Sequence, residues 1–178
     1  MLKMFDIELF LTTIVFILLV TKTKLHKESS MSYQETMPYR EKIAWLSMLA
    51  MLFTFGPYFT LVASGYFPAK PMPDLHQLAG YAITATLQVT LLLVGHMVLR
   101  RRNPQDAKLP ADERDIAIKQ RSVTAAYYVL ITGMILVGVV MPFTSSGWEI
   151  VNSALFMIVF AELVQFSMVV VGYRRQAG

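Results

Sequence analysis

The chain of 178 residues contains no cysteine. That absence excludes disulfide bonds, thiolate metal sites and a cysteine nucleophile. Charge is scarce as well: charged residues make up 16% of the chain and hydrophobic residues 55%, and the mean hydropathy is +0.50. Soluble domains carry about 25% charged residues. The composition therefore indicates a membrane protein with several long uncharged stretches.

Sequence motifs of catalysis are missing too. There is no Walker loop, H-E-x-x-H, G-x-S-x-G or pair of catalytic carboxylates. His26 falls in a predicted loop, whereas His76 and His96 lie at opposite ends of one predicted helix, roughly 30 Å apart at 1.5 Å per residue. These histidines cannot share a metal, although ligation of a haem or pigment by His96 alone stays open. We expect no enzyme activity, no catalytic residue, and no cofactor or metal site.

The basic excess, a net charge of +4 with a pI near 9.4, does not indicate nucleic-acid binding. The basic clusters lack interleaved aromatic residues on an exposed element, which nucleic-acid-binding surfaces commonly have. In a membrane protein, basic residues gather on the cytoplasmic side. We therefore expect the lipid bilayer, and no nucleic acid, among the partners.

Long apolar segments are what the chain does contain. A membrane-spanning helix needs about 20 largely apolar residues. Four segments meet this length: Ile43 to Ala63, Ala79 to Leu99, Val123 to Met141 and Ile150 to Val171. A fifth, Phe5 to Thr21, runs into "KTKLHKESS" without a cleavage site of small residues, which favours an uncleaved anchor over a signal peptide. The sequence thus predicts an all-α, multi-pass transmembrane helical bundle of five spans.

The basic residues predict the orientation of these spans. If the first span runs from outside to inside, the inside segments are 22–42, 100–122 and 174–178, and they hold 14 of the 16 basic residues. Only Lys3 and Lys70 fall outside. The positive-inside bias therefore predicts a bacterial inner-membrane protein with its N-terminus outside and its C-terminus in the cytoplasm.

An internal repeat is visible in the last four predicted spans. The stretch "QVTLLLVGHMVLRR", which starts at Gln88, aligns with "QFSMVVVGYRR", which starts at Gln165. In this alignment Thr90 matches Ser167 and Gly95 matches Gly172. The alternative is coincidence between two apolar strings. A real repeat predicts two tandem hairpins in the same orientation, 43–99 and 112–173, within a four-helix domain of residues 31–178. Residues 1–30 are then a separate anchor helix with a basic linker.

Polar side chains inside the predicted spans form a candidate cluster. Glu162 lies near the middle of the last span, and Gln165, three residues on, shares its helix face. Gln88 and Thr84 make a comparable stripe on the third span. We expect the third and fifth spans to meet, with Glu162 against Gln88 or a nearby threonine. Three roles for Glu162 stay open: a neutral hydrogen-bonded carboxyl that fixes helix register, a group lining a cavity for a proton, ion or small molecule, and a contact to another subunit.

The connector "RRRNPQDAKLPADERDIAIKQRS" is the most distinctive polar stretch. Asp112 is a predicted helix cap with Asp115 at the capping-box position, and the helix runs on into the fourth span. Asp112, Glu113, Arg114 and Asp115 spell "DERD". This motif and "REKIAWLSMLAMLFTFGPYF" resemble families of small uncharacterised bacterial inner-membrane proteins, one of them a domain of unknown function with a D-E-R-[DE] signature. The resemblance covers at most residues 31 to 175, implies no catalytic residues, and suggests companions of small helix-turn-helix regulators.

These features predict a non-enzymatic accessory or regulatory membrane subunit. It would act through helix contacts and its basic cytoplasmic face. Its expected partners are another membrane protein or further copies of itself, together with a soluble cytoplasmic protein. The alternative is a small transporter or ligand-binding membrane protein that uses Glu162.

Overall fold

The computed structural model of the protein describes residues 37–67, 74–145 and 147–176, and these form helices and connecting loops without a β-strand. The long helices are α2 (Tyr39–Ala63), α3 (Leu75–Arg102), α4 (Glu113–Ile135) and α5 (Trp148–Gln176). Among the described residues four helices, counting α4 with its extension to Phe143, are long and apolar enough to cross a membrane. They coincide with four of the predicted spans. The predicted fifth span, Phe5 to Thr21, and the anchor of residues 1–30 lie outside the described residues.

The helices begin where their capping residues allow. α2 begins directly after its N-cap Pro38, which has a φ of −54° and makes no side-chain capping hydrogen bond. The predicted capping box of α4 is confirmed, since Asp112 and Asp115 each accept a hydrogen bond from the backbone of the other. The Asp74 side chain caps α3 by accepting a hydrogen bond from the backbone of His76 at 3.0 Å, which the sequence analysis did not anticipate.

The last turns of the fourth span depart from α-helical geometry. After α4 the chain continues through a π-helical turn, Leu136–Val140, and a 3₁₀ turn, Met141–Phe143. Pro142 has no backbone N–H, so it cannot donate to the carbonyl of Gly138 as the α-helical pattern requires. A π turn, in which each bond spans one residue more, fits a helix that ends this way.

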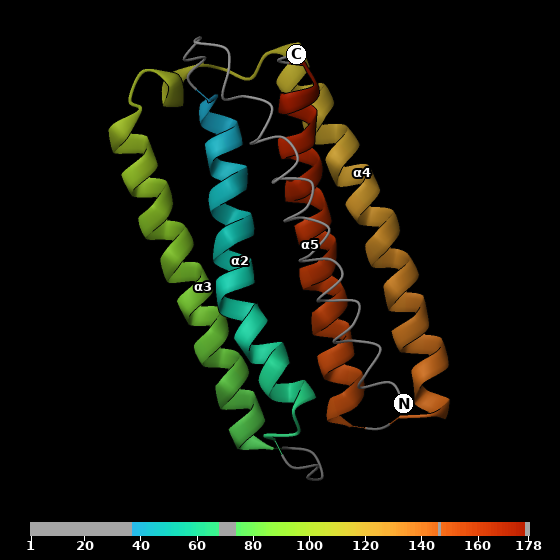
Figure 1. Ribbon diagram of the computed structural model, residues 1–178. Coiled ribbons are helices and arrows are strands. Elements are labelled where there is room, and N and C mark those ends of the chain that lie inside the picture. The colour runs from blue at the N-terminus through green and yellow to red at the C-terminus, as the bar shows by residue number, and fades with distance from the viewer. Residues whose placement is uncertain (1–36, 68–73, 146, 177–178) are drawn as a thin grey trace, which may run out of the picture.

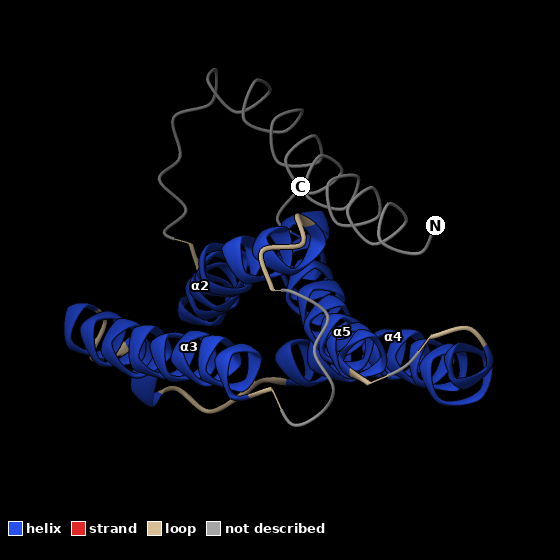
Figure 2. Ribbon diagram, turned by 90° about the horizontal axis from the view of Figure 1, so that it is seen from below, coloured by secondary structure: helices blue, strands red, loops and turns tan. Residues whose placement is uncertain are grey.

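The helices stand side by side in the order α3, α2, α5, α4 (Figure 1). The main contacts join α2 to α3, α2 to α5, and α4 to α5. Seen along the bundle, α2 sits at the apex of an angle between α3 and α5 (Figure 2). The start of α2, the end of α3, the start of α4 and the end of α5 lie together, and we call this the basic end; the other is the opposite end.

The central pair of helices, α2 and α5, forms the core. Its buried residues are Met48, Phe55, Tyr58, Phe59, Phe156, Val159 and Leu163. The rings of Phe59 and Phe156 meet edge to face with centroids 5.3 Å apart. By contrast, only 6% of the apolar stretch of α3 and 17% of that of α4 are buried, against 50% for α2. The two outer helices therefore expose most of their apolar surface to whatever surrounds the bundle.

The two hairpins pack internally in the same manner. A Cβ atom on Gly95 of α3 would lie 2.6 Å from Cδ2 of Leu46 on α2, and one on Gly172 of α5 would lie 2.8 Å from Cγ2 of Ile118 on α4. Glycine permits this close approach between helices. The matched glycines of the repeat thus occupy equivalent positions, each against the first helix of its own hairpin. The expectation that the third and fifth spans meet is wrong, because α2 packs against α5 in place of α3.

Candidate functional site

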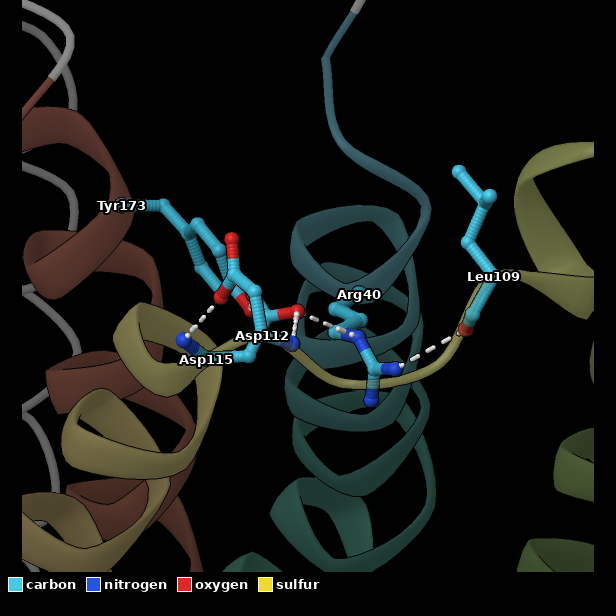
Figure 3. A network of polar contacts seen from close by, with 5 residues as sticks. All are labelled: Arg40, Leu109, Asp112, Asp115 and Tyr173. Atoms are coloured by element: carbon cyan, nitrogen blue, oxygen red, sulfur yellow. Dashed lines mark hydrogen bonds and ion pairs between the residues drawn. The ribbon is translucent and has the colours of Figure 1, made fainter.

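The predicted connector residues lie within a polar network centred on Asp115 at the basic end (Figure 3). The Asp112 side chain accepts a hydrogen bond from the Asp115 backbone N–H at 2.6 Å, and the Asp112 N–H donates to Asp115 Oδ2 at 3.3 Å. Asp115 also accepts a short hydrogen bond from the Tyr173 hydroxyl. Its Oδ2 lies 2.9 Å from Nε of Arg40. One carboxylate therefore joins the starts of α4 and α2 to the end of α5.

Arg40 extends the network to the connector. Its Nη2 donates to the backbone carbonyl of Leu109 at 3.3 Å. Arg114 donates from Nη2 to the carbonyl of Tyr173 at 3.4 Å, which adds a second link between α4 and α5. Glu113, the remaining member of the "DERD" motif, is exposed. Three of the four predicted connector residues thus hold the fold together at this end.

A second ion pair lies beside the first. Nε of Arg174 is 3.0 Å from Oε1 of Glu41, whose side chain is only 7% exposed. The Arg174 guanidinium also lies 5.5 Å from the centre of the Trp45 ring, within the range of a cation–π contact. Lys42, the residue after Glu41, donates from Nζ to Oδ1 of Asn103 at 2.8 Å. Arg40, Glu41 and Lys42 therefore contact α4, α5 and the end of α3 in turn.

These contacts of the first turn of α2 with the other helices could not be predicted from the sequence. The partners of these charged residues are distant in the chain. The partner of Glu41 lies 133 residues away and that of Lys42 lies 61 residues away. Nothing in the local pattern identifies such pairs. The one available signal was that both hairpins begin with charged residues, "YREK" and "ERDI".

Exposed charge surrounds this network. The exposed basic side chains are Arg100, Arg101, Arg102, Lys108, Arg114, Lys119, Arg121 and Arg175. Exposed acidic side chains lie among them at Asp106, Asp112 and Glu113. The arrangement can hold a partner by charge, since its central ion pairs fix the backbone while these exposed side chains lie around it.

The predicted polar cluster in the middle of the bundle is divided between two interfaces. Thr54 on α2 donates to Oε1 of Gln88 at 2.6 Å, and both residues are buried. Nε2 of Gln88 is buried without a hydrogen-bond partner in the part of the chain that the structure describes. Thr84 donates to the carbonyl of Gly80 in its own helix at 2.9 Å. The expected pairing of Glu162 with Gln88 is therefore wrong, because Gln88 faces α2 and not α5.

Glu162 lies on a flank of α5 between its two packed faces. Val159 and Leu163 face α2, whereas Met157 and Gly172 contact α4. An α-helix turns by about 100° per residue, so Glu162 points about 100° away from Leu163. The side chain is half-buried, and the described ranges provide no hydrogen-bond partner for it. Gln165 is half-buried too, on the side that α5 turns toward α4, seven residues before Gly172.

The flank that carries Glu162 turns toward α3. Tyr58 also contacts the α3 side of the bundle through its ring, and its hydroxyl donates to Oδ1 of Asn152 at 2.9 Å. The neighbouring Phe59 meets Phe156. Around the axis of α5, the side chain of Asn152 therefore points about 40° closer to α3 than that of Phe156. The side chain of Glu162 points about 120° away from that of Phe156 in the same direction. By this helical geometry the Glu162 side chain lies on the flank of α5 that turns toward α3.

The pair formed by Tyr58 and Asn152 is a further polar contact that sequence reasoning did not find. Both residues are buried near the opposite end, and the Tyr58 ring meets those of Phe59 on α2, Phe67 after α2 and Tyr81 on α3. An asparagine inside an apolar segment was the available signal, because buried polar groups need a partner. The hydrogen bond fixes the register of α2 against α5.

Among the described residues, no group of three His, Asp or Glu side chains lies close enough together to hold a metal ion. The polar groups instead lie in two places, a charged network at the basic end and a carboxyl on one flank of α5. Comparison of the chain with models of protein families, with curated proteins and with solved structures gives no match.

Proposed function

We propose that the protein is a non-enzymatic accessory or regulatory membrane subunit whose basic end binds a soluble partner. The observation that carries the proposal is the set of two ion pairs and one hydrogen bond by which Arg40, Glu41 and Lys42 join α2 to the rest of the bundle. These contacts fix the connector and three helix ends in one arrangement. A surface held in this way loses little conformational entropy when a partner binds.

The mixture of exposed charges at the basic end favours a protein partner. Basic residues alone would suit the anionic lipids of a membrane surface. Asp106, Asp112 and Glu113 stand exposed among them, and anionic lipid would repel these carboxylates. A protein with both charge signs can complement such a pattern, which gives specificity as well as attraction.

The proposed orientation places the basic end in the cytoplasm of a bacterium, with the helices in the inner membrane. It rests on the positive-inside bias and on the 14 basic residues that one orientation puts inside. The chain has no native cysteine, so single cysteines report without background. A cysteine at Thr144 should react with an impermeant reagent in intact cells, and one at Ala107 should not. Labelling at Ala107 alone would contradict the orientation.

The partner itself is tested by photo-crosslinking in growing cells. A photoreactive amino acid at Leu109 or Glu113, both exposed at the basic end, should capture the same protein. Thr144, exposed at the opposite end, is the matched control and should not capture it. Replacing Arg40 with Gln removes its ion pair with Asp115 and should weaken the capture without removing the exposed charges. Capture from Thr144 alone, or from neither connector position, would sink the proposal.

A second candidate function is binding or transport of a proton, ion or small molecule at Glu162. The observation in its favour is the half-buried carboxyl in the middle of α5, on the flank that turns toward α3. A charged side chain in the middle of a membrane helix costs roughly 2.5–3.5 kcal/mol on insertion scales, so a carboxyl at this depth indicates a site by default. Glu162→Gln keeps the size and the hydrogen-bonding capacity but cannot ionise. The measurement is whether each variant restores the phenotype of cells from which the natural protein has been deleted. A stable Gln variant that does not restore it would favour this candidate, and one that restores it fully would eliminate the candidate.

A further inference from the structure

The order of the helices shows how the two hairpins contact each other. Hairpin one is α2 with α3, and hairpin two is α4 with α5. Because the row runs α3, α2, α5, α4, the first helix of hairpin one packs on the second helix of hairpin two. This is a head-to-tail contact between repeats, and it leaves two different outer helices at the ends of the row. A further hairpin could join at either end by the same contact.

The structure defines which surface of α4 would make that contact. Leu46 and Ile118 are equivalent, since each meets the matched glycine of its own hairpin. Their numbers differ by 72, and from this pair we infer the same step for the other residues of α2 and α4. Under this step the α2 residues buried against α5, Met48, Phe55 and Phe59, correspond to Gln120, Tyr127 and Ile131. All three of these α4 residues are exposed.

The same reasoning defines the matching surface of α3. Gly95 and Gly172 differ by 77, and this step relates α3 to α5. The α5 residues buried against α2, Phe156, Val159 and Leu163, correspond to Ala79, Ala82 and Thr86. These three are exposed as well. The positions that are buried where the two hairpins meet are therefore exposed at both ends of the row.

We propose that a second copy of this chain covers these surfaces, with α4 of one copy packing on α3 of the next as α2 packs on α5. The two surfaces differ in size in a complementary way. Ala79, Ala82 and Thr86 are small, so α3 allows a close approach, and Tyr127 and Ile131 on α4 are large enough to fill the space. The contact joins unlike surfaces, so repeated contacts close into a ring or extend as a row.

The internal interface also predicts which residues meet. The ring of Phe59 lies 5.3 Å from that of Phe156, and this pair corresponds to Ile131 and Ala79. Ser167 donates to the sulfur of Met48 at 3.5 Å, and this pair corresponds to Thr90 and Gln120. A hydroxyl and an amide can hydrogen-bond to each other between helices, which lipid chains cannot do. The contact would not depend on a soluble partner at the basic end.

The absence of native cysteine makes a direct test possible. The full chain carrying Ala79→Cys and Ile131→Cys should form disulfide-linked dimers and larger species when its membranes are oxidised. The matched control pairs Ala79→Cys with Thr132→Cys, because Thr132 is exposed at the same depth but turned about 100° away. The control should form at least about fivefold less product. Equal products from both pairs, or none from either, would overturn the proposal and leave these surfaces to lipid.

Single variants distinguish the head-to-tail contact from a symmetric dimer. Copies with Ala79→Cys alone or Ile131→Cys alone should not crosslink, whereas co-expression of the two should give a dimer and nothing larger. Dimers from either single variant alone, or adducts with a different protein, would contradict the proposal. Ala82→Trp in the reactive double variant should lower the product about tenfold, while its thermal stability in detergent stays unchanged because Ala82 is exposed. Undiminished crosslinking would also overturn it.

Discussion

Replacing Gly172 with alanine tests how closely the helices of the second hairpin approach. The added Cβ would lie 2.8 Å from Cγ2 and 3.2 Å from Cγ1 of Ile118. Ile118 is buried and β-branched, so its χ1 angle has little freedom to move the methyl groups aside. The helices must then separate by a few tenths of an ångström. Overpacking of this kind costs about 1–3 kcal/mol.

Two other glycines serve as controls for the size of this effect. A Cβ on Gly138 would meet nothing within 4 Å, so Gly138→Ala carries no overpacking cost. A Cβ on Gly95 would lie 2.6 Å from Cδ2, 2.7 Å from Cδ1 and 3.1 Å from Cγ of Leu46. The Leu46 side chain is half-buried and not β-branched, so it can change its χ angles more easily than Ile118 can. We expect Gly95→Ala to cost less than Gly172→Ala, and Gly138→Ala to be neutral or slightly stabilising.

The assay is unfolding of the three purified variants in mixed detergent micelles, followed by helix content as the denaturing detergent increases. The expected order of stability is Gly138→Ala, Gly95→Ala, Gly172→Ala, with about 1–3 kcal/mol between the first and the last. If Gly172→Ala is as stable as Gly138→Ala, the helices do not approach as closely as described. If Gly95→Ala is the least stable, the argument from side-chain freedom fails.

The remaining predictions concern three polar contacts, each measured with the same unfolding assay. Arg174→Met should cost about 3 kcal/mol because it leaves Glu41 buried without its partner, and adding Glu41→Gln should recover part of that loss; additive losses would exclude the coupling. Asp112→Ala should cost about 1 kcal/mol through loss of the helix cap, and Asp112→Asn clearly less; equal losses would argue against capping. Tyr58→Phe should cost about 0.6 kcal/mol, a usual value for a hydrogen bond in a membrane protein; after Asn152→Leu the same change should have no further effect.

The helices and their caps could be predicted from the sequence because both depend on local patterns. Apolar length gave four helices, and the spacing of Asp112 and Asp115 gave the capping box that the structure shows. The π turn at Leu136–Val140 was not predicted, although Pro142 marked the place where regular bonding ends. A proline limits which bonds can form, but it does not decide how the preceding turn adjusts.

The packing order of the helices could not be predicted, because it depends on which faces of different helices fit together. Gln88 and Glu162 lie at similar positions within their helices, and this suggested that they meet. The structure places Thr54 beside Gln88 instead, since α2 separates α3 from α5. A polar residue in an apolar segment indicates that some partner exists, and it does not identify the helix that provides one.

The contacts at the basic end have a consequence for the order of synthesis. A ribosome releases Glu41 long before Arg174, which lies 133 residues later, and Tyr173 follows its partner Asp115 by 58 residues. The first turn of α2 is therefore made while the Glu41 carboxylate still lacks its partner on α5. Its ion pair can form only after α5 has been made. A nascent chain stalled before residue 173 would hold its inserted helices without this closure, exposed to proteases at that end, and completion of the last turn of α5 would end this vulnerable period.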